Sequence, residues 1–340
     1  MLQGLIIGCG SIGERHLFNL KKLGIENIGI YDADDKKTNM LAKKYKVTKF
    51  KDLKSALDNS PDFSVICTPS TSHVNIAKKC TESGTHIFIE KPISNDLSGV
   101  SKLLAYADRK DLRIAIGYNM RFDESLNHVR KKLQTRQFGN LLSVLCEWGN
   151  NIRNWNHPNY LNHYVLQKGG GIIFDDSHEY DYLRWLLDDE VVSVYCKTQK
   201  LKNLKTETES LASIILEFKR GTVGTLIIDY VRAEYERRCH IIGEKGSIRW
   251  NFTRPSIIKQ NYRTSAQSMV TSRYVSGKNS QTVVFTNELN KTYLLEMKDF
   301  LNAIKNDRKP VVDGLEGLKT LKIGIAAHES ARKGLPIKLN

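Results

Sequence analysis

Short apolar runs alternate with segments of helical period over the first third of the chain. The apolar runs predict strands at Leu2–Ile7, Ile28–Asp32, near Lys49, and at Phe63–Cys67, His86–Ile89 and Arg113–Gly117. Between them, apolar residues with helical spacing predict helices at Glu14–Leu23, Lys36–Tyr45, Leu53–Leu57, His73–Ser83 and Leu97–Lys110. Repeated strand–helix units of this kind predict a doubly wound parallel sheet with helices on both faces.

The second half of the chain follows a different pattern. Apolar and polar residues alternate in Val192–Cys196, Ala212–Phe218, Val223–Asp229 and Arg238–Gly243, which predicts a largely antiparallel sheet. Helices are predicted from about Ile173 to Leu187, at Tyr293–Ile304 and at Leu315–Lys333. Residues 255–290 are polar and weakly patterned, and they indicate no function.

These two patterns, together with the length of the chain, predict the fold class and the domain organisation. A chain of 340 residues is long enough for about two domains. We predict an α/β protein with an N-terminal Rossmann domain at residues 1–120. A C-terminal α+β domain with a large, mostly antiparallel sheet is expected at residues 121–340.

Composition narrows the class of protein. No stretch approaches the roughly 18 apolar residues of a membrane span, and the first residues predict a strand and a turn without a basic leader. We therefore expect a cytoplasmic protein with no membrane partner. The six cysteines form no CxxC pair, which is typical of reduced thiols, and His157, His163 and His178 lack a compact ligand spacing. No metal site is expected.

The chain is basic, with 52 Lys and Arg against 37 Asp and Glu and a formal charge of +15. These residues are spread over the whole chain in short lysine doublets, whereas nucleic-acid binders more often cluster them with stacking aromatics. We expect solvated surfaces and no nucleic-acid partner. The alternative is that the charge helps to attract a phosphorylated ligand.

A glycine-rich turn follows the first predicted strand and opens the first predicted helix. It reads Gly8-Cys9-Gly10-Ser11-Ile12-Gly13. In dinucleotide sites the first glycine permits a tight turn, the second lets the backbone approach a pyrophosphate, and the third lets the helix pack closely on the sheet. The pyrophosphate would then lie on the amides of the helix N-terminus. The cofactor-binding residues predicted here are Gly8, Gly10, Ser11, Ile12 and Gly13.

Asp32 ends the second predicted strand, about 20 residues beyond the glycines, where dinucleotide folds place the acid that binds the adenosine ribose hydroxyls. Its carboxylate would repel a 2′-phosphate, and Ala33-Asp34-Asp35 offers no arginine to accept one. The cofactor predicted is therefore NAD, with NADP the less favoured alternative because Lys36 and Lys37 follow closely.

Three further strand ends carry polar residues. In doubly wound sheets ligands bind beyond the carboxyl ends of the strands. The ends are Cys67-Thr68-Pro69, Glu90-Lys91-Pro92 and Gly117-Tyr118-Asn119.

Four short motifs in this order and spacing closely resemble the glucose-fructose oxidoreductase / inositol dehydrogenase (Gfo/Idh/MocA) family. They are Gly8-Cys-Gly-Ser-Ile-Gly, Cys67-Thr-Pro-Ser with His73, Glu90-Lys91-Pro92, and Gly117-Tyr-Asn-Met-Arg-Phe122. The resemblance implies that Lys91 hydrogen-bonds the reacting hydroxyl and helps to move its proton. It also implies that Thr68, Pro69, His73, Glu90, Lys91 and Asn119 line the cofactor site.

A glycine triplet at Gly169 precedes a predicted helix in which Asp175 stands one turn before His178. An acid in this position can orient an imidazole, although a histidine can also simply pack against its own helix. The resemblance places a catalytic histidine here, so His178 is predicted to be catalytic, with Asp175 as its partner. Many relatives carry the acid four residues before the histidine, where this chain has Phe174, so Asp176 is an alternative.

The segment from Trp148 to Tyr164 is dense in amide, aromatic and arginine side chains. Such a surface is typical of carbohydrate binding, and the alternative is a polar interdomain linker. The predicted substrate contacts are Lys91, Arg121, Arg153, Trp155, Tyr164 and His178, and the two arginines could meet a phosphate or carboxylate.

The function predicted is an NAD-dependent dehydrogenase that oxidises, or forms, a secondary hydroxyl of a sugar or nucleotide-sugar. The Trp155 loop resembles members acting in surface-polysaccharide sugar synthesis. Alternatives are a dehydrogenase of inositol or another cyclitol, and a non-catalytic NAD-binding regulator that responds to sugars. The resemblance also implies a homodimer or homotetramer.

Overall fold

The computed structural model describes residues 2–154, 164–166, 169–202, 206–253, 267–288 and 290–339. The chain divides into two compact units. The first comprises residues 1–119 and 293–321, and the second comprises residues 120–292 and 322–340. The domain boundary predicted at residue 120 lies at the end of the first segment of the first unit. The prediction placed residues 293–321 in the C-terminal domain, whereas the structure groups them with the first unit.

The first unit is a six-stranded sheet with the order β3-β2-β1-β4-β5-β6. Its strands are β1 (Gly4–Ile7), β2 (Ile28–Tyr31), β3 (Thr48–Lys49), β4 (Phe63–Ile66), β5 (His86–Ile89) and β6 (Ile114–Ile116). Every neighbouring pair is parallel. Strands β1 and β4 are fully buried, which explains why apolar residues dominate their sequences. The predicted doubly wound parallel sheet is confirmed.

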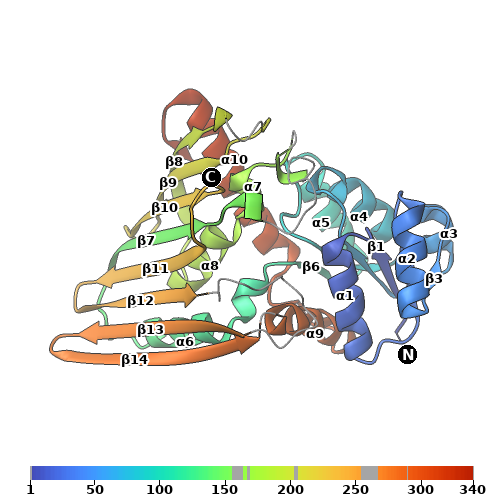
Figure 1. The fold of residues 1–340 in the computed structure, drawn as a ribbon, viewed down its shortest axis with the longest axis horizontal. Coiled ribbons are helices and arrows are strands. Elements are labelled where there is room, and N and C mark those ends of the chain that lie inside the picture. Colours follow the sequence, from blue (N-terminus) through green and yellow to red (C-terminus); the bar gives the residue numbers. More distant parts are fainter. Residues whose placement is uncertain are drawn as a thin grey trace. The chain divides into compact units, whose positions relative to one another are not determined.

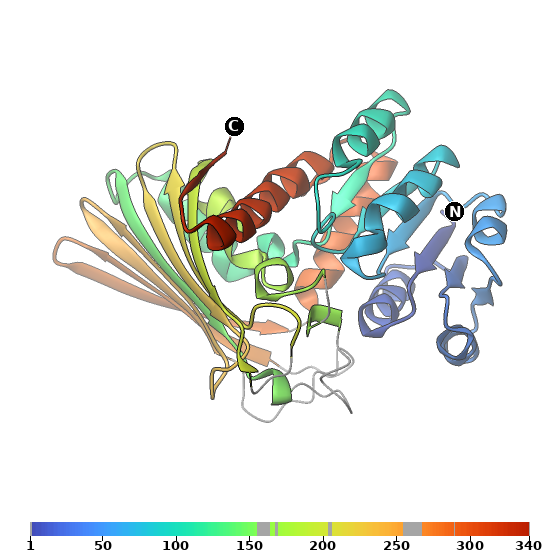
Figure 2. The same ribbon diagram turned by 90° about the horizontal axis from the view of Figure 1, so that it is seen from above.

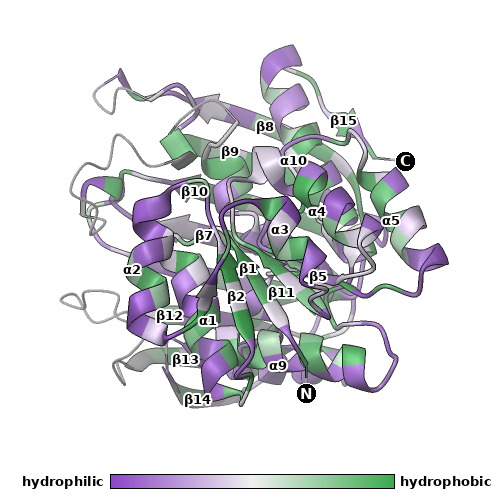
Figure 3. Ribbon diagram, turned by 90° about the vertical axis from the view of Figure 1, so that its right-hand side faces the viewer, coloured by the Kyte–Doolittle hydropathy of each residue, from purple (hydrophilic) through white to green (hydrophobic). Residues whose placement is uncertain are grey.

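Helices flank both faces of this sheet (Figure 3). They are α1 (Ser11–Lys22), α2 (Asp35–Tyr45), α3 (Leu53–Asp58), α4 (His73–Glu82), α5 (Val100–Arg109) and α9 (Lys291–Lys305), with the 3-10 turn η1 (Ser70–Ser72). Met297 and Phe300 of α9 share one core cluster with Leu17 of α1 and with Phe63 and Phe88 of the sheet. This shared apolar core explains why α9 groups with the first unit although it is distant in sequence.

The second unit is built on a nine-stranded sheet with the order β14-β13-β12-β11-β7-β10-β9-β8-β15 (Figure 1). Its strands are β7 (Leu141–Gly149), β8 (Val191–Gln199), β9 (Leu211–Phe218), β10 (Val223–Asp229), β11 (Glu236–Gly243), β12 (Gly246–Thr253), β13 (Gln267–Ser276), β14 (Asn279–Glu288) and β15 (Ile337–Lys338). Strands β7 and β10 are parallel, and every other neighbouring pair is antiparallel. The predicted mostly antiparallel sheet is confirmed.

The helices of the second unit lie along one face of its sheet (Figure 2). They include α6 (Glu124–Gln134), α7 (Ile172–Asp175), α8 (His178–Leu187) and the end of α10 (Gly314–Lys333), and 3-10 turns occur at η2 (Asn119–Phe122), η3 (Ile152–Asn154) and η5 (Tyr164–Leu166). Buried and exposed residues alternate along β9, which is typical of a strand with one covered face. The strands β13 and β14 lie within residues 255–290, where the sequence is polar and only weakly patterned. No helix in the described part of the chain is long and apolar enough to cross a membrane.

Candidate active site

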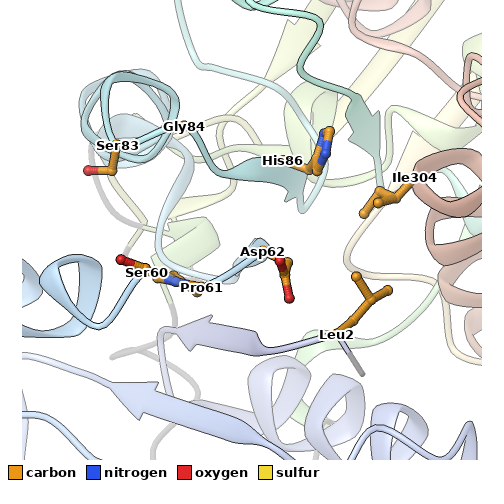
Figure 4. A pocket seen from close by; sticks show the side chains of 8 residues that line it. All are labelled: Leu2, Ser60, Pro61, Asp62, Ser83, Gly84, His86 and Ile304. Atoms are coloured by element: carbon orange, nitrogen blue, oxygen red, sulfur yellow. The ribbon is translucent and has the colours of Figure 1, made fainter.

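The residues predicted to bind the cofactor gather at one edge of the parallel sheet. Because its strands are parallel, their carboxyl ends meet at the same edge. This edge carries Gly8 after β1, Asp32 after β2, Thr68 after β4, Glu90 and Lys91 after β5, and Asn119 after β6. A shallow hollow of about 250 Å³ lined by Leu2, Asp62 and His86 lies at the amino ends of the strands, away from this edge (Figure 4).

The three glycines of the turn differ in what an added side chain would meet. Gly8 has a φ of +99°, and a Cβ there would lie 2.7 Å from the backbone of Cys67. A Cβ on Gly13 would lie 1.9 Å from the carbonyl oxygen of Gly8. Apart from Gly10 itself and its two chain neighbours, no described residue has an atom within 4 Å of a Cβ added to Gly10. The fold therefore requires Gly8 and Gly13, whereas Gly10 leaves space that a ligand can occupy.

Helix α1 begins next to this space. Gly10 is its N-cap and provides no side-chain hydrogen bond, so the amides of Ser11, Ile12 and Gly13 point out of the first turn without a carbonyl partner in their own helix. These amides and the helix dipole favour an anion at this end. The turn fits the pyrophosphate of a dinucleotide.

Asp32 is fixed against the glycine turn. Its Oδ2 accepts a hydrogen bond from the amide of Cys9 at 2.6 Å, and its Oδ1 accepts one from the amide of Asp34 at 2.8 Å. Burial, and then the charge of Asp32, raise the pKa of the Cys9 thiol to about 12, which keeps this thiol protonated at neutral pH. The carboxylate keeps acceptor capacity for ribose hydroxyls, since each oxygen has two lone pairs.

His73 bridges two of the strand ends. Its Nε2 lies 2.7 Å from the carbonyl oxygen of Thr68, and its Nδ1 lies 2.9 Å from that of Pro92. Burial lowers the pKa of His73 in spite of these two carbonyls, and a neutral ring donates to one of them only. Pro69 is exposed and Thr68 half-buried, so these two can meet a ligand, while His73 holds the ends together from behind.

Glu90 points inward from the end of β5. Its Oε1 lies 2.6 Å from Nε2 of His16, and its Oε2 accepts a hydrogen bond from the amide of Lys91 at 3.1 Å. Burial alone would raise the pKa of Glu90, but the hydrogen bond from His16 and the charges of His16 and Lys91 outweigh it and lower the pKa. Glu90 therefore anchors the turn that carries Lys91, which is half-buried and precedes a cis peptide bond to Pro92.

Asn119 and Arg121 belong to η2, and both are buried. Arg121 donates to both carboxylate oxygens of Asp181 on α8, at 2.9 and 2.7 Å. This buried bidentate pair uses Nε and Nη2 of the guanidinium and ties Arg121 to α8. The predicted contact of Arg121 with a substrate stays a prediction.

The predicted helix around His178 is interrupted. Helix α7 ends at Asp175 and α8 begins at His178, because Asp176 leaves the helical conformation at φ −103° and ψ +39°. The sequence prediction of one continuous helix was wrong on this point. Asp175 accepts a hydrogen bond from the hydroxyl of Tyr230 at 2.9 Å. His178 is half-buried at the first position of α8, and the orientation of its ring by Asp175 stays a prediction.

A buried ion cluster beneath the start of α8 was not predicted from sequence. Arg237 of β11 donates from Nε to Glu179 at 2.7 Å and from Nη2 to Asp176 at 3.3 Å, and all three side chains are buried. Burial opposes the charge of Arg237, but Glu179 and Asp176 hold its pKa well above the usual value. The sequence signal was an acid, Glu179, on a helix whose other residues are mostly apolar or aromatic.

The predicted substrate loop is described only in part. Arg153 is exposed in η3, and the backbone of Tyr164 lies in η5. Trp155 lies outside the described residues.

Comparison with known proteins adds to this geometry. Residues 2–118 match the family model described as an oxidoreductase family, NAD-binding Rossmann fold, and residues 130–339 match the C-terminal alpha/beta domain of that oxidoreductase family. Myo-inositol 2-dehydrogenase of Thermotoga maritima is 26% identical over 98% of this chain and 97% of its own. The scyllo-inositol 2-dehydrogenase (NAD(+)) of Bacillus subtilis is 24% identical over 98% of this chain and 95% of its own.

A similar solved structure is the WlbA dehydrogenase of Bordetella pertussis, in complex with NADH and UDP-GlcNAcA. It superimposes with a TM-score of 0.82 at 22% identity and covers 100% of this chain and 99% of its own. This likeness supports the fold.

Proposed function

Because the chain belongs to the Gfo/Idh/MocA oxidoreductase family, we propose that it is an NAD-dependent dehydrogenase acting on a secondary hydroxyl of a polyhydroxylated ring. The observation that supports this proposal most directly is the glycine turn, where Gly10 leaves space at the start of α1 and Asp32 is fixed beside it. The inositol dehydrogenases that match along nearly the whole chain favour a cyclitol or a sugar as the ring.

The residues of this chain would divide the work as follows. The amides at the start of α1 would bind the pyrophosphate, and Asp32 would bind the adenosine ribose. When bound, NAD⁺ supplies the hydride acceptor. Lys91 would hydrogen-bond the reacting hydroxyl, and Lys91 and His178 would take up its proton as the carbonyl forms. Asp175 would orient His178, and Arg153 and Trp155 would contact the ring.

A nucleotide-sugar is the second candidate substrate. The net charge of +15 and the exposed position of Arg153 favour an anionic ligand over a neutral one. Neither feature is needed for a cyclitol.

The test is NAD⁺ reduction by the purified protein with three substrate groups: inositol isomers, free sugars and nucleotide-sugars. We expect NADH formation with at least one member, and its class decides between the two candidates. The Lys91→Ala variant is the matched control, since it should bind NAD but turn over slowly. Binding of NAD without reduction by any member would instead support the sugar-responsive regulator and refute the enzyme.

A further inference from the structure

Three ionisable side chains meet behind the carboxyl edge of the parallel sheet. They are His16 of α1, Glu90 after β5 and Glu296 of α9, with exposed fractions of 0%, 8% and 2%. One ligand atom from each lies within 4.8 Å of the others. All three belong to the first unit.

The cluster has the residue types of a metal site, but the distance between His16 and Glu90 fits a hydrogen bond and not two ligands of one metal ion. His16 Nε2 and Glu90 Oε1 are 2.6 Å apart. Two ligands of one tetrahedral zinc ion, each at about 2.0 Å from the metal, would be about 3.3 Å apart. The shorter distance is that of a charge-assisted hydrogen bond, in which the imidazole N–H donates to the carboxylate.

Glu296 is in a different situation from Glu90. Within the described part of the chain, neither of its carboxyl oxygens has a hydrogen-bond partner. Burial, and then the negative charge of Glu90, raise the pKa of Glu296 well above its ordinary value, and the charge of Arg15 on α1 opposes this. Glu90 and His16 face Glu296 from their own elements, and the buried Cys67 thiol also lies within its field. A carboxyl in these surroundings keeps its proton.

Glu90 connects this cluster to Lys91. Its second oxygen accepts the Lys91 amide, and a Cβ on Gly117 would lie only 3.0 Å from that oxygen. The carboxylate is thus held between His16, Gly117 and the backbone of the turn. Its charge and orientation act directly on the lysine that follows it in sequence.

We propose that His16 and Glu296 are positioning residues for Lys91 and act through Glu90. His16 keeps Glu90 ionised and oriented, and Glu296 remains a neutral acid, so that Lys91 lies beside one negative charge and not two. This proposal rests on the proposed function of Lys91 in proton transfer.

One arm of the test needs no substrate. Infrared difference spectra of the wild-type chain against Glu296→Gln at neutral pH should show the carbonyl stretch of a protonated carboxylic acid, shifted in D₂O. A difference spectrum that contains only carboxylate bands would overturn the neutral state of Glu296. This result is independent of whether the protein turns over any substrate.

The second arm measures the pH profile of kcat/KM. In His16→Leu the carboxylate of Glu90 loses its donor, ionises less readily and stabilises the lysine ammonium less. The limb that Lys91→Ala abolishes should therefore move to lower pH by at least about half a unit, a free-energy change that such a hydrogen bond can supply. His16→Gln, whose amide can reach the same carboxylate, should restore it. An unmoved limb in a folded His16→Leu variant refutes the coupling, and an enzyme without any activity refutes the proposed function instead.

Discussion

Replacing Gly10 with alanine should weaken NAD binding while the fold remains intact. Beyond residue 10 and its two chain neighbours, the added Cβ meets no described residue within 4 Å, and the φ of −73° suits alanine, so the apo protein has no steric reason to change. The methyl group would stand where the pyrophosphate approaches the amides of α1. Loss of one hydrogen bond to a charged group costs about 1.5–3 kcal/mol, which weakens binding about 10- to 140-fold.

Calorimetric titration with NAD and thermal unfolding together provide the assay. Gly10→Ala should lower the NAD affinity by that factor, with a change in Tm below about 2 °C. Gly13→Ala is the contrast, because its Cβ would lie 1.9 Å from the carbonyl oxygen of Gly8 and should destabilise the first unit by about 1–3 kcal/mol. Wild-type affinity in Gly10→Ala would refute the assignment of the pyrophosphate to this turn. A large loss of Tm in that variant would refute the inference that the space is empty.

Four further outcomes can be measured. Lys91→Ala and His178→Ala should each lower kcat by roughly a hundredfold with little change in NAD affinity, and the double variant should lose less than the product of the two factors; additive losses would show that they do not form one unit. NAD should bind more tightly than NADP, because Asp32 repels the 2′-phosphate, and equal calorimetric affinities would contradict this. The raised pKa of Glu296 means that the folded state keeps a proton which the unfolded chain loses above its ordinary value of 4.5, so stability falls as pH rises through this window. Denaturant titrations should therefore show Glu296→Gln gaining on the wild type as pH rises, and parallel curves would contradict a neutral Glu296. Ile215 is one of the exposed positions that alternate with buried ones along β9, and Ile215→Arg should shift a homodimer or homotetramer toward monomer in light scattering, whereas an unchanged mass would exclude this strand face as the interface.

The parallel sheet could be predicted from sequence because its central strands are buried on both faces. Such strands are mostly apolar, as in Phe63–Ile66 where Ser64 is the one polar residue, and the glycine turn follows β1 without a gap. The position of the cofactor residues then follows from topology alone, since the carboxyl ends of parallel strands share an edge.

The β13–β14 hairpin could not be predicted in this way. Its strands pair over their full length, from Gln267 opposite Glu288 to Ser276 opposite Asn279, yet few of their residues are buried. A strand with polar residues on both faces has no alternation to detect. Backbone pairing with β12 holds it in the sheet, and backbone pairing carries no sequence signal.

The side-chain partners of Arg121 and Arg237 were equally hidden, because each lies far away in sequence. Arg121 pairs with Asp181, and Arg237 pairs with Glu179. Sequence assigned Arg121 to an anionic substrate because an isolated arginine near a site gives no sign of an internal acid. In the structure Arg121 is only 4% exposed, and its contact with a substrate stays a prediction.

Each of the two predicted proton-handling residues has a buried acid next to it in sequence, and this acid holds the backbone in place. Lys91 follows Glu90, and His178 precedes Glu179; in each case the acid is buried and pairs with a cationic or hydrogen-bonding side chain from another element, His16 in one unit and Arg237 in the other. Removing one partner of a buried pair typically lowers the stability of a protein by about 3–5 kcal/mol, so a displacement of either acid from its partner is strongly unfavourable. Lys91 and His178 themselves are half-buried. A buried neighbour fixes the backbone of each, while the atoms of its side chain remain able to reach a substrate.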